Sequence, residues 1–195
     1  MADSPAAIPG AVKVVIAGGF GVVKTTLVSA VSDIAAVTTE AMMTQVGTGV
    51  DDVRLVPRKR STTVALDFGR VDLDDQLSLY LFGTPGQERY WFMWSDLIRG
   101  ALGAVVLVDT RRLRDCFGAV DFFEARQLPF VVVVNQFDGA RTHSDQQLRD
   151  ALAIGEQVPL LTCDARHRDG VKRVLIVLLE HLISLRHDSR RAAAA

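Results

Sequence analysis

The segment GGFGVVKTT, residues 18–26, places a glycine-rich turn directly before a lysine and two threonines. In the pattern G-x-x-x-x-G-K-[ST], backbone N–H groups of such a turn cradle phosphate, the lysine reaches the terminal phosphates and the next hydroxyl binds Mg²⁺. The alternative is a glycine-rich turn of another doubly wound protein, but the order of apolar run, glycines and lysine favours phosphate binding. The predicted phosphate-binding residues of this loop are Gly18, Gly19, Phe20, Gly21, Val22, Val23, Lys24, Thr25 and Thr26.

Val23 departs from this pattern, because it stands where the last glycine of the loop is expected. A β-branched residue at a position that needs positive φ costs about 1–3 kcal/mol of strain, and its methyl groups would crowd the anion. Natural drift and an introduced change both explain one substitution in an otherwise intact loop. We therefore expect this chain to bind nucleotide weakly and a Val23→Gly variant to bind it normally.

The segment NQFD, residues 135–138, follows the apolar run FVVVV and could read the base of a nucleotide. A carboxylate at Asp138 can accept two N–H bonds from guanine, a donor pair that adenine lacks. The alternative is a plain Asn/Asp turn after a strand, which is common. The position of NQFD downstream of a phosphate loop favours recognition of guanine, and therefore binding of GTP over ATP.

The segment GTPGQER, residues 83–89, follows a further predicted strand. Gly86 offers a backbone N–H to a γ-phosphate, and Gln87 stands where a glutamine would orient the attacking water. The alternative is a simple Pro-Gly turn. Together with the loop at residues 18–26, the segment predicts phosphoryl transfer to water.

The elements that must position these residues alternate between short apolar strands and longer helical stretches. The predicted strands are residues 12–17, 63–71, 76–82, 104–108, 130–134 and 158–161. Helices are predicted at residues 25–36, near residue 97, and at 114–127, 144–153 and 169–185. Most strands are apolar on consecutive residues, as in a parallel sheet covered on both faces, while the turn DLDD predicts a hairpin. The fold class is therefore α/β, with a mostly parallel six-stranded sheet, one antiparallel strand and helices on both faces.

Composition narrows the class of protein further. A chain of 195 residues with 49% hydrophobic residues predicts one domain at residues 11–186, with disordered tails at 1–10 and 187–195. The net charge of −1 carries no electrostatic signature of nucleic-acid binding. Two distant cysteines indicate free thiols in a reducing compartment. No signal sequence or membrane-spanning run is evident, so we expect a cytoplasmic protein.

These motifs, in this order and spacing, resemble the Ras-like small GTPases, P-loop NTPases built on a G domain. The segments TTVALDFG, LFGTPGQERYWFMW, VNQFDG and TCDAR resemble the bacterial branch most, namely the actinomycete conservon GTPases (an ATP/GTP-binding protein family) and, more distantly, the gliding-motility polarity GTPases. The resemblance implies GTP or GDP as ligand and Mg²⁺ as cofactor. It implies that Thr63, or Thr62 beside it, is the switch I threonine that senses the γ-phosphate and joins Thr25 as a metal ligand. It also implies that Gly86 and Gln87 belong to switch II. The guanine-binding residues it implies are Asn135, Gln136, Asp138, Asp164, Ala165 and Arg166, with the Ala165 N–H donated to the base carbonyl.

Three positions besides Val23 depart from the wider GTPase pattern. Gly83 replaces the aspartate that usually holds Mg²⁺ through water, so metal affinity is expected to be modest. Pro85 replaces a small residue, as the bacterial branch often shows. Gln136 replaces the lysine that usually packs across the base, so guanine selectivity rests on Asp138.

Catalysis would use Gln87, Lys24 and an arginine that stabilises the developing charge. The resemblance makes Arg60, just before the switch threonine, the candidate arginine, although a solvated basic loop is the stronger reading of the segment VRLVPRKRST. The aromatic cluster YWFMW, residues 90–94, exceeds what one helix face can bury, so Tyr90 or Trp91 is expected to be partly exposed toward an effector.

The sequence thus favours a GTP-hydrolysing molecular switch. A pseudo-GTPase that serves as an interaction module is the alternative, supported by Val23, Gly83 and Gln136, whereas a nucleotide kinase or ATPase is disfavoured by NQFD and CDAR. The resemblance implies a roadblock-type regulatory partner and a sensor kinase-like membrane protein. Membrane contact would then occur through these partners, at the inner face of the membrane.

Overall fold

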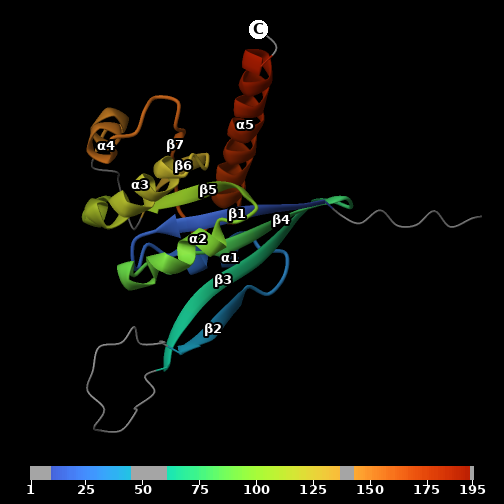
Figure 1. The fold of residues 1–195 in the computed structure, drawn as a ribbon, viewed down its shortest axis with the longest axis vertical. Helices are drawn as coiled ribbons and strands as arrows, with labels where there is room; N and C mark the ends of the chain where they lie inside the picture. Colours follow the sequence, from blue (N-terminus) through green and yellow to red (C-terminus); the bar gives the residue numbers. More distant parts are fainter. Residues whose placement is uncertain (1–9, 45–60, 137–142, 194–195) are drawn as a thin grey trace, which may run out of the picture.

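The computed structural model describes residues 10–44, 61–136 and 143–193, which form a seven-stranded sheet with helices on both faces (Figure 1). The strand order is β2-β3-β4-β1-β5-β6-β7. The strands are β1 Gly10–Gly18, β2 Val37–Thr44, β3 Ser61–Asp74, β4 Leu77–Gly83, β5 Ala101–Val108, β6 Phe130–Asn135 and β7 Leu160–Cys163. Strand β3 runs antiparallel to β2 and β4, and the other neighbours are parallel. The mostly parallel sheet with one antiparallel strand is confirmed.

The strand count of six was one too low, because β2 adds an edge strand beside β3. Its residues pair with β3 from Val37 opposite Phe68 to Thr44 opposite Ser61. The segment VTTEAMMT has only a short β-branched start and no bounding turn, so its strand state depends on this ladder. Figure 1 shows β2 and β3 reaching beyond the rest of the sheet.

Strand β1 lies at the centre and is buried on both faces, as its continuous apolar run predicted. Val14 and Ile16 pack in one layer with α1 (Lys24–Val31) and α5 (Arg168–Ala193). Val15 and Ala17 pack in the opposite layer with α2 (Trp94–Leu97), α3 (Phe117–Ala125) and the end of α4 (Asp145–Leu152). The helices therefore cover both faces, and both cysteines, Cys116 and Cys163, are buried free thiols.

Helix α5 is longer than expected, and the predicted disordered tail at 187–195 is wrong up to Ala193. The residues after Leu185 are mostly arginine, serine and alanine, with neither glycine nor proline to end the helix. Gly10 belongs to β1, so the predicted N-terminal tail at 1–10 is wrong at its last residue, and residues 1–9 lie outside the described residues. Within the described residues, none of the helices combines the length and apolarity needed to cross a bilayer.

Because β1, β4, β5, β6 and β7 are parallel, their carboxyl ends meet at one edge of the sheet. Ligands of open α/β sheets bind at this edge. Two short 3₁₀ helices, η1 (Glu88–Met93) and η2 (Thr110–Cys116), follow β4 and β5 there. The predicted motifs also follow these strand ends, and the fold brings them together.

Candidate nucleotide-binding site

The phosphate loop leaves β1 at Gly18, where the backbone requires glycine. Gly18 has φ 139°, and a Cβ at this position would lie 2.4 Å from the carbonyl oxygen of Leu107 in β5. Gly21 also has positive φ, at 75°. The loop therefore owes its shape to the glycines that the sequence motif supplies.

Val23 adopts the left-handed conformation, with φ 65° and ψ 39°, immediately before α1. The expectation that this position needs positive φ is confirmed. Its carbonyl accepts a hydrogen bond from the Leu27 N–H at 3.1 Å, and its half-buried side chain packs against the core layer below α1. The strain of a β-branched residue at positive φ is thus present, and core packing offsets part of it.

Lys24 is buried, with 8% of its surface exposed, and points back into the loop. Its Nζ donates hydrogen bonds to the carbonyl oxygens of Gly18 at 3.0 Å and Gly19 at 2.9 Å. Burial lowers the pKa of Lys24 to about 8, against the attraction of the Asp67 carboxylate, which raises it. A Cβ on Gly86 would lie 2.8 Å from Lys24 Nζ and 2.8 Å from the Gly19 oxygen. The structure therefore brings Gly86 directly onto the phosphate loop.

Asp67 is a site residue that the sequence analysis missed. The Thr25 hydroxyl donates a hydrogen bond of 2.8 Å to Asp67 Oδ2, and Asp67 is 8% exposed. Asp67 pairs with Gly83 across β3 and β4, and a Cβ on Gly83 would lie 2.8 Å from Asp67 Cβ. The carboxylate of Asp67 thus fills the space that a side chain at position 83 would need.

Thr25 and Asp67 together offer oxygen atoms suited to Mg²⁺. Mg²⁺ is usually bound by one or two carboxylates and substrate phosphates rather than by a complete protein cage. In the described part of the chain, no group of three or more His, Cys, Asp or Glu residues could hold a metal alone. The donor set therefore fits a metal that is shared with bound phosphates.

Thr63 is not brought to Thr25, in contrast to the role that the resemblance implied. Its backbone lies in the β2–β3 ladder opposite Met42. At the strand rise per residue, it is about 13 Å along β3 from Asp67. The extension of the β2–β3 ladder holds it there, while Arg60 and Asp138 lie outside the described residues.

At the base side of the site, Asn135 ends β6 and ties it to the loop after β7. Its Oδ1 accepts a hydrogen bond of 2.9 Å from the Ala165 N–H, and both residues are buried. The Gln136 N–H donates to the Cys163 carbonyl at 2.8 Å. The Ala165 N–H, which was predicted to donate to a base, therefore donates to Asn135 instead. Its contact with a base stays a prediction, and the N–H would have to leave Asn135 or be shared with the base.

The side chains of Asp164 and Arg166, on either side of Ala165, form an ion pair with each other. The Arg166 side chain donates to both carboxylate oxygens of Asp164, at 2.9 Å and 2.7 Å for the closest contacts. These hydrogen bonds lower the pKa of Asp164 to about 2. The turn around Ala165 is thereby fixed, and the guanine contacts of this pair stay a prediction.

The aromatic residues of the switch II segment differ in their exposure. Tyr90 is buried at 9% exposed, Trp91 is half-buried, and the most exposed aromatic side chain of the cluster is Phe92, at 63%. Trp94 is buried, and its Nε1–H donates to the Pro85 carbonyl at 3.2 Å. The prediction that Tyr90 or Trp91 is partly exposed is confirmed by Trp91, and the more exposed Phe92 was not singled out.

Known proteins resemble the chain in sequence and in fold. It is 28% identical over 129 residues to Uncharacterized protein MJ1339 of Methanocaldococcus jannaschii. The aligned residues cover 65% of this chain and 71% of that protein. It is 25% identical over 139 residues to the Ras-related protein SEC4 of Saccharomyces cerevisiae. The aligned residues cover 67% of this chain and 64% of that protein.

Among solved structures, the G domain of the T. maritima FeoB iron transporter has a TM-score of 0.61 at 15% identity, over 88% of this chain and 99% of that chain. The cytosolic domain of the same transporter, in its apo form, has a TM-score of 0.62 at 15% identity, over 89% of this chain and 64% of that chain. The small GTPase-like fold that the motifs predicted is confirmed.

The family described as Conserved hypothetical ATP binding protein matches residues 16–185. This range extends from within β1 into α5 and includes the phosphate loop, Asp67, Asn135 and Ala165. The chain belongs to this family of P-loop NTPases.

Proposed function

We propose that this protein is a guanine-nucleotide-dependent switch that binds GTP with Mg²⁺ and hydrolyses it to GDP. The observation that carries the proposal is the convergence of Lys24, Gly86 and Thr25 at the carboxyl end of β1. Gly86 packs against Lys24, and Thr25 is oriented by its 2.8 Å bond to Asp67. A γ-phosphate bound there would meet a cation, a hydroxyl and the switch II backbone at once.

Each of these residues has a distinct role in the proposed reaction. Lys24 exchanges its bonds to loop carbonyls for bonds to the terminal phosphates. Thr25 and Asp67 would hold the metal, which would supply neutralisation of phosphate charge. Gln87 orients a water whose oxygen bonds to the γ-phosphorus as the bond to the β–γ bridging oxygen breaks. The electron pair leaves with GDP, and the water proton passes to the released phosphate.

Guanine rather than adenine is proposed because of Asp138, which follows β6 and the buried Asn135. The family description mentions ATP, and the related SEC4 is Ras-related, so nucleotide choice needs a direct test. Calorimetric titration of GDP and ADP, each with Mg²⁺, should give at least tenfold tighter binding of GDP. Lys24→Ala should weaken both nucleotides equally, which separates phosphate binding from base recognition. Tighter binding of ADP would contradict the proposal.

The second candidate is a pseudo-GTPase, and the left-handed Val23 is the observation that favours it. The two candidates differ in turnover, so phosphate release from GTP by the chain and by Val23→Gly decides between them. Release by both supports the switch. GTP binding without release in either variant supports the interaction module.

The resemblance to conservon GTPases extends the proposal to a roadblock-type regulatory partner and a sensor kinase-like membrane protein. The exposed Phe92 beside switch II suits such a protein contact, because aromatic side chains often anchor interfaces. Phe92→Ser should abolish binding to a purified roadblock-type partner and leave GDP affinity unchanged. Unaltered partner binding would remove this surface from the proposal.

A further inference from the structure

An open cavity of about 330 Å³ lies between the phosphate loop, the start of switch II and η2. Its lining residues are Phe20, Gly86, Gln87, Arg112, Arg114 and Asp115. The cavity therefore connects the two switch II residues that the proposed function assigns to the γ-phosphate with two arginines from η2. Neither arginine belongs to a motif that would mark it as functional in the sequence.

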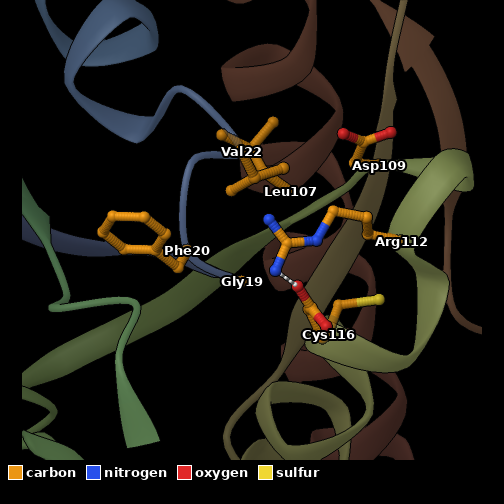
Figure 2. A pocket seen from close by; sticks show the side chains of 8 residues that line it. Gly19, Phe20, Val22, Leu107, Asp109, Arg112 and Cys116 are labelled. Carbon is orange, nitrogen blue, oxygen red and sulfur yellow. Dashed lines mark ion pairs between the residues drawn. The ribbon is translucent and has the colours of Figure 1, made fainter.

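Helix η2 is packed directly against the phosphate loop. A Cβ on Gly19 would lie 2.6 Å from Asp115 Cβ and 3.0 Å from the Asp115 carbonyl oxygen. The remaining space between the loop and η2 is about 10 Å³, which is room for about one water molecule. Figure 2 shows this contact, with Phe20 and Gly19 on one side and η2 on the other. A side chain of η2 can therefore act on a phosphate held by the loop.

Arg112 is directed into this contact by the backbone. Its φ of −140° and ψ of 48° are not helical, so it interrupts η2. Its guanidinium forms an ion pair of 2.6 Å with Asp115 Oδ2 and extends toward Gly19 (Figure 2). The Arg114 guanidinium is 3.8 Å from the other oxygen of Asp115, with 88% of the side chain exposed. Arg112 is thus the arginine that is held beside the loop.

We propose that Arg112 is this chain's own arginine for the terminal phosphate, and that Asp115 holds it beside the loop until a nucleoside triphosphate competes for it. This inference rests on the proposed function. A guanidinium is always charged and pairs with phosphate through two parallel hydrogen bonds, so it suits a γ-phosphate that carries more charge than one carboxylate. The same contact stabilises the charge that develops as the phosphate leaves GDP.

Arg111 provides a matched control, because it is the neighbouring arginine but has a different partner. Its guanidinium donates to both carboxylate oxygens of Asp109, at 2.9 Å and 2.8 Å for the closest contacts. It does not line the cavity that contains Gly86 and Gln87. If only the lost surface charge matters, Arg111→Ala and Arg112→Ala should lower GTPγS affinity alike. If Arg112 contacts the γ-phosphate, only Arg112→Ala should lower GTPγS affinity.

The test compares the dissociation constants of GDP and GTPγS, by calorimetry, for the parent chain and the Arg112→Ala, Arg112→Lys and Arg111→Ala variants. All are measured in the parent and in the Val23→Gly background. We expect Arg112→Ala to weaken GTPγS at least tenfold and GDP less than twofold, with Arg112→Lys intermediate and Arg111→Ala unchanged. Single-turnover GTP hydrolysis should slow at least tenfold in Arg112→Ala, and Asp115→Asn should raise the preference for GTPγS over GDP.

Two results would overturn the role of Arg112 alone. One is equal behaviour of Arg112→Ala and Arg111→Ala, and the other is an equal loss of GDP and GTPγS affinity, which a structural role would give. The proposed function fails separately. If neither the parent chain nor Val23→Gly binds GDP, then nucleotide binding itself is refuted, and the role of Arg112 is refuted with it.

Discussion

Lys24 should link the stability of the fold to pH, because burial lowers its pKa despite the attraction of the Asp67 carboxylate. Its pKa of about 8 lies below the ordinary value of 10.5, so the unfolded chain binds this proton more tightly than the folded chain. Between pH 8 and pH 10.5 the unfolded state therefore holds more protons, and stability rises with pH. The difference between a pKa of about 8 and 10.5 corresponds to about 3 kcal/mol of added free energy of unfolding. This added stability is absent below pH 8 and fully present above pH 10.5.

Urea unfolding from pH 7.5 to 10.5 measures this contribution when the parent chain is compared with Lys24→Met. Methionine keeps much of the apolar length and removes the charge. Other groups titrate in this window, including Lys13, whose pKa is lowered by burial, and Cys163, whose pKa is raised by burial. They affect both proteins alike, so the difference between the two curves isolates Lys24. We expect the parent to gain about 3 kcal/mol relative to the variant across the window.

Nucleotide provides the matching control. Phosphates beside Lys24 favour its charged form, so saturating GDP should flatten the difference between the parent and Lys24→Met below pH 10. Parallel stability curves of the two proteins without nucleotide, from pH 7.5 to 10.5, would refute the reasoning. They would mean that Lys24 reaches solvent and that its bonds to Gly18 and Gly19 do not persist in solution.

Three further predictions concern the same site. Val23→Gly should change the free energy of unfolding by less than about 1 kcal/mol, because relief of strain is offset by lost packing and by the entropy of glycine. The same variant should bind GDP more tightly in calorimetry, and equal GDP affinities of the parent and the variant would contradict this. Asp67→Asn should keep a bond to Thr25 but reduce the Mg²⁺ dependence of GDP affinity at least tenfold, measured with Mg²⁺ and with EDTA. Gly86→Ala should cost about 1–3 kcal/mol in thermal unfolding, because its Cβ would lie 2.8 Å from the Gly19 carbonyl oxygen and 2.9 Å from Phe20 Cα; an unchanged melting temperature would argue against this packing.

The parts of the site that the sequence predicts are those that a few neighbouring residues determine. The phosphate loop is contiguous, and Gly18, Val23 and Lys24 have the conformations or positions that the motif requires. Strand β2 could not be predicted in the same way, because its state depends on pairing with β3 rather than on its own pattern. Asp67 was missed because its role arises only when the register sets it opposite Gly83. A signal existed in hindsight, namely an acidic residue in an otherwise apolar strand.

The departures from the GTPase pattern have unequal physical consequences, and this bears on the choice between a switch and a pseudo-GTPase. The missing carboxylate at Gly83 is replaced in space by Asp67, which contacts Thr25 and stabilises the charge of Lys24. Steric contact between positions 67 and 83 allows a side chain at only one of them, so the exchange is coupled. Val23 has no such replacement, but it adopts the positive φ of a glycine and leaves the loop backbone in place. Its cost therefore falls mainly on nucleotide affinity, through methyl groups that crowd the phosphate, while the charges that phosphoryl transfer needs are retained, which favours the switch.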